Sequence, residues 1–139
     1  MLRDTILVLI GGGIGAALRE LLMLGVANLP GGFPMPIFVA NMTATLLLGV
    51  FSALTITGGL IGPRGKLLLM TGILGGLSTF SSFVWGTHQL LTNPAEQVSA
   101  IVYVVLSMFG GFLLVELGLW LGGRFMRSHI EAAGPREEL

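Results

Sequence analysis

Four long apolar segments, separated by short stretches rich in glycine and proline, account for most of this chain. The segments run from about residue 5 to 27, 37 to 56, 67 to 91 and 95 to 121. Each is long enough to cross a bilayer as a helix, which takes roughly 20 mostly apolar residues. The pattern therefore predicts an all-α integral membrane protein with four transmembrane helices.

The fourth segment has the clearest start. Asn93 can cap a helix, Pro94 suits the first helical position, and Glu96 follows three residues after Asn93. Beyond this segment, residues 128–139 mix charges with a Gly-Pro pair, and we expect them to be disordered. The chain then divides into a four-helix membrane domain, residues 1–127, and a short tail.

The third segment is interrupted at its middle. Lys66 and Leu91 bracket it, and its midpoint lies close to Ser78, within the run Gly75-Gly76-Leu77-Ser78-Thr79-Phe80-Ser81-Ser82-Phe83. A helix in hydrocarbon should avoid anything that loosens its backbone, because each unpaired backbone group there is costly. Interruptions of this kind at mid-membrane are typical of ion or substrate sites. We therefore predict that the third helix is broken at mid-membrane.

The composition agrees with a membrane protein and narrows its chemistry. Hydrophobic residues make up 53% of the chain and charged residues 10%, against about 25% charged in a soluble domain. The formal net charge is zero and cysteine is absent, so we expect no nucleic acid partner and no disulfide or thiolate site. The sequence shows no metal-ligand cluster, nucleophile–base pair or phosphate loop, and we expect no enzyme activity.

Basic residues gather on one side of the predicted bundle. An even number of spans puts both termini on one side, and the loops of the other side hold no Lys or Arg. The positive-inside rule then places both termini in the cytoplasm, for a multi-pass protein of the inner (plasma) membrane. The basic residues of the cytoplasmic side are Arg3, Arg64, Lys66, Arg124, Arg127 and Arg136.

Two polar side chains inside the first two spans are candidates for a site. Arg19 is the one basic residue within a span. Intramembrane charges are functional candidates, but Arg19 is close enough to the helix end for its side chain to reach the headgroups instead. Asn41 offers two donors and one acceptor, which suit either an ion site or hydrogen bonds between packed helices.

Aromatic and hydroxyl side chains supply the other candidates. Phe80 and Phe83 are three residues apart, so they share a face if the helix resumes after the break. The positive edges of their rings can attract an anion, and Ser81 is one of the hydroxyl residues beside them. Tyr103 and Ser107 are four apart on the fourth span and suit a polar track. For these residues, ordinary packing is the alternative interpretation.

Three motifs in these segments resemble the Fluc (CrcB) fluoride channel family. Gly11-Gly12-Gly13-Ile14-Gly15-Ala16-Ala17-Leu18-Arg19 is similar to the family's first-helix motif, and Val39-Ala40-Asn41 is similar to part of its second helix. The run from Gly75 to Phe83 matches the third-helix signature, with Ser78 and Ser82 where threonine is usual. The third motif is long and specific, and the resemblance covers nearly the whole chain except the tail.

The resemblance implies a passive fluoride channel that gives fluoride resistance, built as an antiparallel homodimer of dual topology with two pores. Arg19 would lie in the vestibule, attracting anions or bracing it. Gly75 and Ser78 would offer backbone carbonyls to a structural sodium ion shared by the two subunits. The residues implied to line the fluoride pore are Asn41, Phe80, Ser81, Phe83, Tyr103 and Ser107.

The chain departs from the family's pattern in several places. Glu20 follows the first-helix arginine where tyrosine or tryptophan is usual, and Ala44-Thr45-Leu46 replaces a Gly-Ser-Phe. Gly86 stands where a glutamate is often found after the second phenylalanine. The strong Lys/Arg bias also favours a single orientation, so pairing with an oppositely oriented paralogue is the alternative to a homodimer.

Two other functions fit parts of the sequence. Glu20 could exchange protons and a cationic drug in a small four-helix multidrug exporter, although Arg19 beside it and the central break do not fit that class. A membrane scaffold without transport would use the glycines only for packing between helices.

Overall fold

The computed structural model describes residues 2–58 and 60–133, and this part of the chain contains helices and no strands. It has four helical segments long and apolar enough to cross a membrane, as predicted. The first is α1 (Leu2–Gly25) and the second is α2 (Met35–Gly58). The third joins α3 (Pro63–Lys66), the π-helix η1 (Leu67–Leu74), α4 (Gly75–Leu77) and α5 (Phe80–Thr92), and the fourth joins the 3₁₀ turn η2 (Pro94–Glu96) and α6 (Gln97–Ala133).

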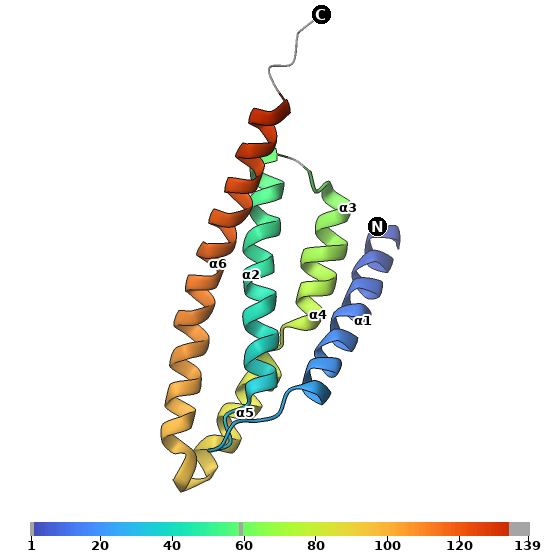
Figure 1. Ribbon diagram of the computed structural model, residues 1–139. Coiled ribbons are helices and arrows are strands. Elements are labelled where there is room, and N and C mark those ends of the chain that lie inside the picture. The colour runs from blue at the N-terminus through green and yellow to red at the C-terminus, as the bar shows by residue number, and fades with distance from the viewer. Residues whose placement is uncertain (1, 59, 134–139) are drawn as a thin grey trace, which may run out of the picture.

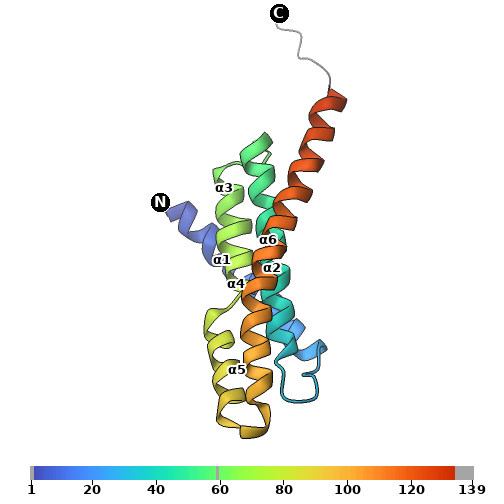
Figure 2. The same cartoon turned by 90° about the vertical axis from the view of Figure 1, so that its left-hand side faces the viewer.

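The four segments run up and down between the two ends of an elongated bundle (Figure 1). We call the end where α1 and α3 begin the upper end and the end where α5 meets α6 the lower end, as drawn in Figure 1. Turning the molecule shows the interruption halfway along the third segment, between α4 and α5 (Figure 2). The basic residues at the start of α1, in α3 and in the last turns of α6 therefore belong to the upper end.

The buried core consists mainly of small residues, and many large apolar side chains point outward. Ala40 and Ala100 are 0% and 1% exposed, whereas Leu9 and Phe109 are 68% and 69% exposed. Lipid is as apolar as leucine, so membrane helices associate through small residues that let their backbones approach. This arrangement fits the predicted membrane protein.

Glycines bring α1 against the third segment before its break. A Cβ built on Gly15 would collide with the carbonyl oxygen of Ile73, and a Cβ on Gly72 would lie 2.8 Å from the Cα of Gly11. Two helices can approach this closely only where a side chain is missing. We call this contact the α1 seam, and its glycines are Gly11, Gly12, Gly15, Gly72 and Gly76.

A second close contact joins α2 to α6. A Cβ built on Gly118 would collide with the carbonyl oxygen of Leu46, and a Cβ on Gly122 would lie 2.8 Å from the Cβ of Ala53. Both helices continue through the contact without interruption. We call it the α6 seam, and its small residues are Gly49, Ala53, Gly118 and Gly122.

The third segment widens before it breaks, which the sequence does not predict. Residues Leu67–Leu74 form a π-helix, a rare conformation that is frequent at functional sites. The widened turns lie against α1, where a Cβ on Gly11 would come within 2.5 Å of the carbonyl oxygen of Leu68. The π-helix is therefore part of the α1 seam.

The fourth segment starts as predicted and extends further. Asn93 accepts a hydrogen bond from the Ala95 N–H at 3.2 Å, but α6 continues to Ala133, so residues 128–133 are helical where the sequence predicts a disordered tail. Extending a formed helix is cheap, and this stretch ends in Glu-Ala-Ala, which are good helix formers. Residues 134–139, the rest of the predicted tail, lie outside the described residues.

Candidate functional site

The third segment breaks at Ser78 and Thr79, as predicted. Helix α4 ends just before Ser78, and the two residues have extended backbone, with φ/ψ of −76°/150° and −149°/116°. The last carbonyls of α4 and the first N–H groups of α5 therefore lack partners within their own helices. In a bilayer such groups must be satisfied by other parts of the protein. The neighbours of these groups define the candidate site.

Asn41 of α2 meets the break from one side. Its Oδ1 accepts a hydrogen bond from the Thr79 N–H at 2.8 Å, and its Nδ2 donates to the Thr79 carbonyl at 3.4 Å. One side-chain amide thus pairs both backbone groups of a residue in the break. An amide nitrogen carries two N–H groups, so Asn41 keeps a second donor.

Arg19 of α1 meets the break from the other side. Its Nη1 donates a hydrogen bond to the Gly76 carbonyl at 3.2 Å, and the side chain is half-buried. Gly11, Gly15 and Arg19 are spaced by four residues, so they share one face of α1. The α1 seam therefore brings Arg19 to the end of α4, a contact that the sequence analysis does not foresee.

The side chain of Thr79 caps the helix that follows the break. Its Oγ1 accepts a hydrogen bond from the Ser82 N–H at 3.2 Å and lies 3.0 Å from the Ser81 Oγ. Thr79 is only 9% exposed. Sequence reasoning does not single out Thr79. The available signal was a threonine three residues before Ser82, at the position where an N-cap is expected.

A hollow of about 370 Å³ opens beside the break, and we call it the break hollow. Four of the predicted pore residues line it together, and none of its lining side chains is formally charged. Two methionines that the sequence analysis does not consider also line it. Its lining residues are Asn41, Met42, Thr45, Ser78, Thr79, Phe80, Phe83, Ser107 and Met108. The predicted residues Ser81, Tyr103 and Arg19 are not among them.

Phe80 and Phe83 share one face of α5, because the helix resumes directly after the break. Their ring centroids are 6.1 Å apart, with 32° between the ring planes. Phe80 is 79% exposed, whereas Phe83 is half-buried. One ring therefore stands open at the mouth of the break hollow and the other lies deeper in it.

Tyr103 lies behind the break hollow, where it is completely buried. Its ring packs against Phe83 and Phe33, with ring centroids 5.3 Å apart in each pair. The Tyr103 hydroxyl has no hydrogen-bond partner within the part of the chain that the structure describes. A buried hydroxyl normally has a partner, so this unpaired group stands out among the predicted pore residues.

Gly75 and Ser78, the predicted sodium ligands, line a smaller hollow together. It measures about 130 Å³, and both Thr45 and Ser78 line it as well as the break hollow. Within residues 2–58 and 60–133 no group of three or more His, Cys, Asp or Glu side chains could hold a metal ion. Among the residues that line this hollow, only backbone carbonyls and the hydroxyls of Thr45 and Ser78 offer oxygen ligands to a cation.

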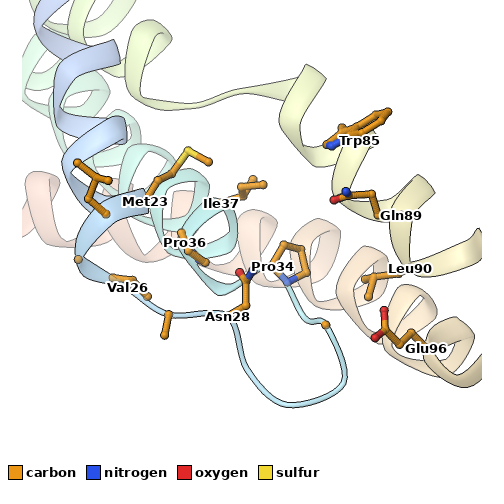
Figure 3. Close-up of a pocket in the computed structure, with 15 residues that line it drawn as sticks. Met23, Val26, Asn28, Pro34, Pro36, Ile37, Trp85, Gln89, Leu90 and Glu96 are labelled. Carbon is orange, nitrogen blue, oxygen red and sulfur yellow. The ribbon is translucent and has the colours of Figure 1, made fainter. Parts of the chain in front are cut away.

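A cavity of about 770 Å³ lies at the lower end, among α1, α2, α5 and η2 (Figure 3). Glu96, Gln89 and Trp85 line it together with Gly86. A Cβ on Gly86 would lie 3.1 Å from the Cγ of Pro34. A glutamate would be crowded at this position, which gives a physical reason for the glycine found there.

A comparison with protein families covers most of the chain. Residues 6–119 match the family described as CrcB-like protein, Camphor Resistance (CrcB). The chain belongs to the CrcB family. CrcB proteins form a channel family, so this member is not an enzyme. With four spanning segments, it is a multi-pass protein of the bacterial inner membrane, as predicted.

Several curated relatives are similar to this chain over most of its length. Fluoride-specific ion channel FluC 3 of Yersinia pseudotuberculosis is 49% identical over 117 residues, which cover 84% of this chain and 87% of the relative. FluC of Chlorobium chlorochromatii is 34% identical over 122 residues, 85% of this chain and 94% of the relative. FluC 1 of Brucella abortus is 41% identical over 124 residues, which cover 88% of this chain and 45% of that longer relative.

Proposed function

We propose that this CrcB protein is a passive, fluoride-selective channel through which fluoride leaves the cytoplasm. The observation that carries the proposal is the break hollow, where an amide, hydroxyls and two phenyl rings surround a broken helix without any charged side chain. The relatives named as fluoride-specific ion channels support the same ion.

The chemistry of the break hollow suits fluoride, which is small and strongly hydrated. A pore must replace the lost water with donors, yet each site must be weak enough to release the ion. The second N–H of Asn41 and the Ser107 hydroxyl are such donors, and Phe80 and Phe83 offer the positive edges of their rings. A ring of arginines would hold the anion too tightly.

Two further donors extend this track beyond the break hollow. The Tyr103 hydroxyl is buried and unpaired within the described residues, so a passing anion would stabilise it. Ser81 follows Phe80, and its Oγ already lies 3.0 Å from the Thr79 Oγ1. Arg19 belongs to the vestibule, where its charge attracts anions while its Nη1 holds the Gly76 carbonyl.

The pore is completed by a second chain in antiparallel orientation. One chain leaves the break hollow open, with an amide and hydroxyl groups in its lining, and polar groups in the hydrocarbon region are better covered by protein than by lipid. The break lies near the middle of the third segment, so the breaks of two oppositely oriented copies lie at the same depth in the membrane. The partner is a second copy of this chain, or an oppositely oriented paralogue if the Lys/Arg bias prevents dual insertion.

Backbone carbonyls of Gly75 and Ser78 would hold a structural sodium ion that the two subunits share. Carbonyls at the end of a helix lack partners, and half-helix ends coordinate sodium in other membrane transport proteins. The Gly76 carbonyl accepts a hydrogen bond from Arg19, so the proposed ligands are the carbonyls on either side of it, one residue before and two residues after. Two carbonyls from one chain are too few for a cation, so the site needs both chains.

The exporter alternative depends on Glu20 and has less support. Glu20 is exposed on α1 and does not line the break hollow. A carboxylate that exchanged protons with a drug would be expected in the binding cavity itself.

Ion flux from liposomes that hold the purified chain alone tests the proposed function. We expect fluoride efflux that needs no proton gradient, with chloride efflux far slower. Comparable fluoride and chloride rates would refute selectivity, and cation exchange driven by a pH gradient would favour the exporter. The absence of any flux from a well-folded dimer would favour the scaffold.

The sodium site has its own test, because backbone carbonyls survive a change of side chain. Ser78→Ala should retain sodium-dependent stabilisation of the dimer, whereas Gly75→Val should disturb the backbone and lose it. Thermal unfolding in sodium and in a large organic cation measures both. Equal unfolding temperatures in the two salts for the unmodified chain would rule the ion out.

A further inference from the structure

Helix α6 carries a separate surface hollow at the upper end, far along the chain from the break. It measures about 190 Å³, and we call it the α6 hollow. All of its lining residues belong to one helix, so it needs no particular arrangement of the other spans. They are Leu119, Trp120, Gly123, Arg124 and Arg127.

Gly123 creates the α6 hollow without serving the packing of the chain. A Cβ on Gly123 would meet nothing within 4 Å, whereas one on the adjacent Gly122 would lie 2.8 Å from the Cβ of Ala53. Glycine in a helix interior costs about 1 kcal/mol relative to alanine. Gly122 is explained by the α6 seam, but Gly123 is not, and its visible effect is the space that it leaves between larger side chains.

Two positive charges border this space. Arg124 and Arg127 are three residues apart, so they share a face of α6. The guanidinium carbon of Arg124 lies 5.5 Å from the centre of the Trp120 ring, a cation–π contact that helps to hold it in place. Neither arginine forms an ion pair within the described residues. The α6 hollow therefore presents two guanidinium groups without a counter-ion among the described residues, and Trp120 orients that of Arg124.

The depth of the α6 hollow matches the headgroup layer of a bilayer. The hydrocarbon core is about 30 Å thick, which a helix crosses in about 20 residues. Counted from Gln97, the start of α6, the core is crossed shortly before Trp120. Tryptophan is enriched at this level and arginine just beyond it.

We propose that the α6 hollow binds the phosphate group of an anionic phospholipid. A phosphodiester carries one negative charge and paired oxygens that arginine can bind in bidentate fashion. Gly123 gives the phosphate room against the helix, and Trp120 packs against the start of the acyl chains. This site is independent of the proposed fluoride path, because it shares no residue with the break hollow.

The proposal is tested with the full-length dimer, purified in a neutral detergent and titrated with phosphatidylglycerol. Native mass spectrometry counts bound lipid, and thermal unfolding reports stabilisation. Each arginine near an anionic lipid contributes about a fivefold gain in affinity, so replacing both in R124Q/R127Q should weaken phosphatidylglycerol binding by about 25-fold. Phosphatidylcholine, whose headgroup has no net charge, should bind weakly to all variants.

Two further variants separate the hollow from the charge. Gly123→Leu fills the hollow and keeps both arginines, so it should lose most of the phosphatidylglycerol binding while it folds normally. R64Q/K66Q removes two positive charges from the same end of the molecule, outside the hollow, and should leave that binding within about twofold. Fluoride flux in phosphatidylcholine liposomes should be unchanged in Gly123→Leu, which keeps this test distinct from that of the channel.

Several results would overturn the proposal. Normal lipid binding by Gly123→Leu, or equal losses in R64Q/K66Q and R124Q/R127Q, would reduce the effect to general charge attraction. A drop in the dimer fraction of Gly123→Leu would show that the hollow is a contact between chains. Stabilisation by inorganic phosphate as strong as that by phosphatidylglycerol would assign the site to free phosphate and refute the lipid.

Discussion

The two glycine seams pack helices in the same way, but a different kind of residue follows the glycines on each helix face. Along α6, the face that begins at Gly118 and Gly122 continues to Met126, which is 3% exposed. Along α1, the face that begins at Gly11 and Gly15 continues to Arg19, which donates to the Gly76 carbonyl.

This difference separates close packing from function. Both seams bring backbones to the distance that only small residues allow. The α6 seam joins two unbroken helices and stabilises the bundle. The α1 seam instead places the side chain of Arg19 beside α4, which follows the π-helix and ends at the break. A glycine pattern therefore predicts a close contact, and the next residue on the same face decides whether the contact serves a site.

The largest effects are expected from adding one methyl group to each seam. Gly15→Ala would meet the Ile73 carbonyl and Gly118→Ala the Leu46 carbonyl, so both should destabilise the fold by about 1–3 kcal/mol through overpacking. Only Gly15→Ala should also abolish flux per folded channel, because it moves Arg19 and the break apart. Unfolding in denaturant and liposome flux measure the two quantities.

Gly13→Ala is the matched control for the seams, because a Cβ there meets nothing within 4 Å. It should leave stability and flux close to those of the unmodified chain. If Gly118→Ala stops flux as completely as Gly15→Ala at equal stability, the distinction between the seams is wrong.

Asn41→Ala should have the next largest effect. The Thr79 N–H would lose its partner, and an unpaired buried donor costs about 1–3 kcal/mol. The Thr79 carbonyl would keep the Phe83 N–H at 3.3 Å, so the break should loosen on one side, and flux should fall at least tenfold. Thr55→Ala removes a hydroxyl bonded only to its own helix at the Phe51 carbonyl, and full flux is expected from it.

The phenylalanines test whether ring edges contact the ion. Phe80→Ile and Phe83→Ile keep the apolar character and remove the ring quadrupole, so each should cut flux severalfold while the dimer stays folded. Phe109→Ile, at a position 69% exposed on α6, is the control and should conduct normally. Normal flux through all three variants would mean that Phe80 and Phe83 have only a packing role.

Arg19 offers the finest distinction and the smallest expected effect. Arg19→Lys keeps the charge, and Arg19→Gln keeps a planar N–H donor for the Gly76 carbonyl without the charge. If holding the break matters more, Gln should preserve the sodium-dependent stability better than Lys does. If attracting anions matters more, Lys should preserve flux at low fluoride better than Gln, and a difference of about two- to fivefold is expected either way.

Much of the fold could be predicted because the bilayer restricts what a sequence can do. Four apolar segments of spanning length, and a run of glycine and hydroxyl residues at the middle of one, leave few alternatives to a broken third helix. The partners of the break were not predictable in the same way. That Asn41 pairs with Thr79, and Arg19 with Gly76, depends on how three helices cross, which neither periodicity nor composition encodes.

Local features were missed for different reasons. The π-helix of Leu67–Leu74 has no composition signal of its own, because leucine-rich turns fit an α-helix equally well. Residues 128–133 look like a solvated tail from their charges, yet they extend an existing helix at little cost. The burial of Tyr103 behind Phe83 arises from the turn at Phe33, which is distant in sequence.

The charge difference between the two ends of the bundle has an electrical consequence. Arg3, Arg64, Lys66, Arg124 and Arg127 lie toward the upper end, and the lower turns carry no Lys or Arg. A parallel pair would give one membrane surface all of this positive potential, so its fluoride current would rectify. In the antiparallel pair that we propose, each surface receives one end of each chain, and the current–voltage curve is expected to be symmetric.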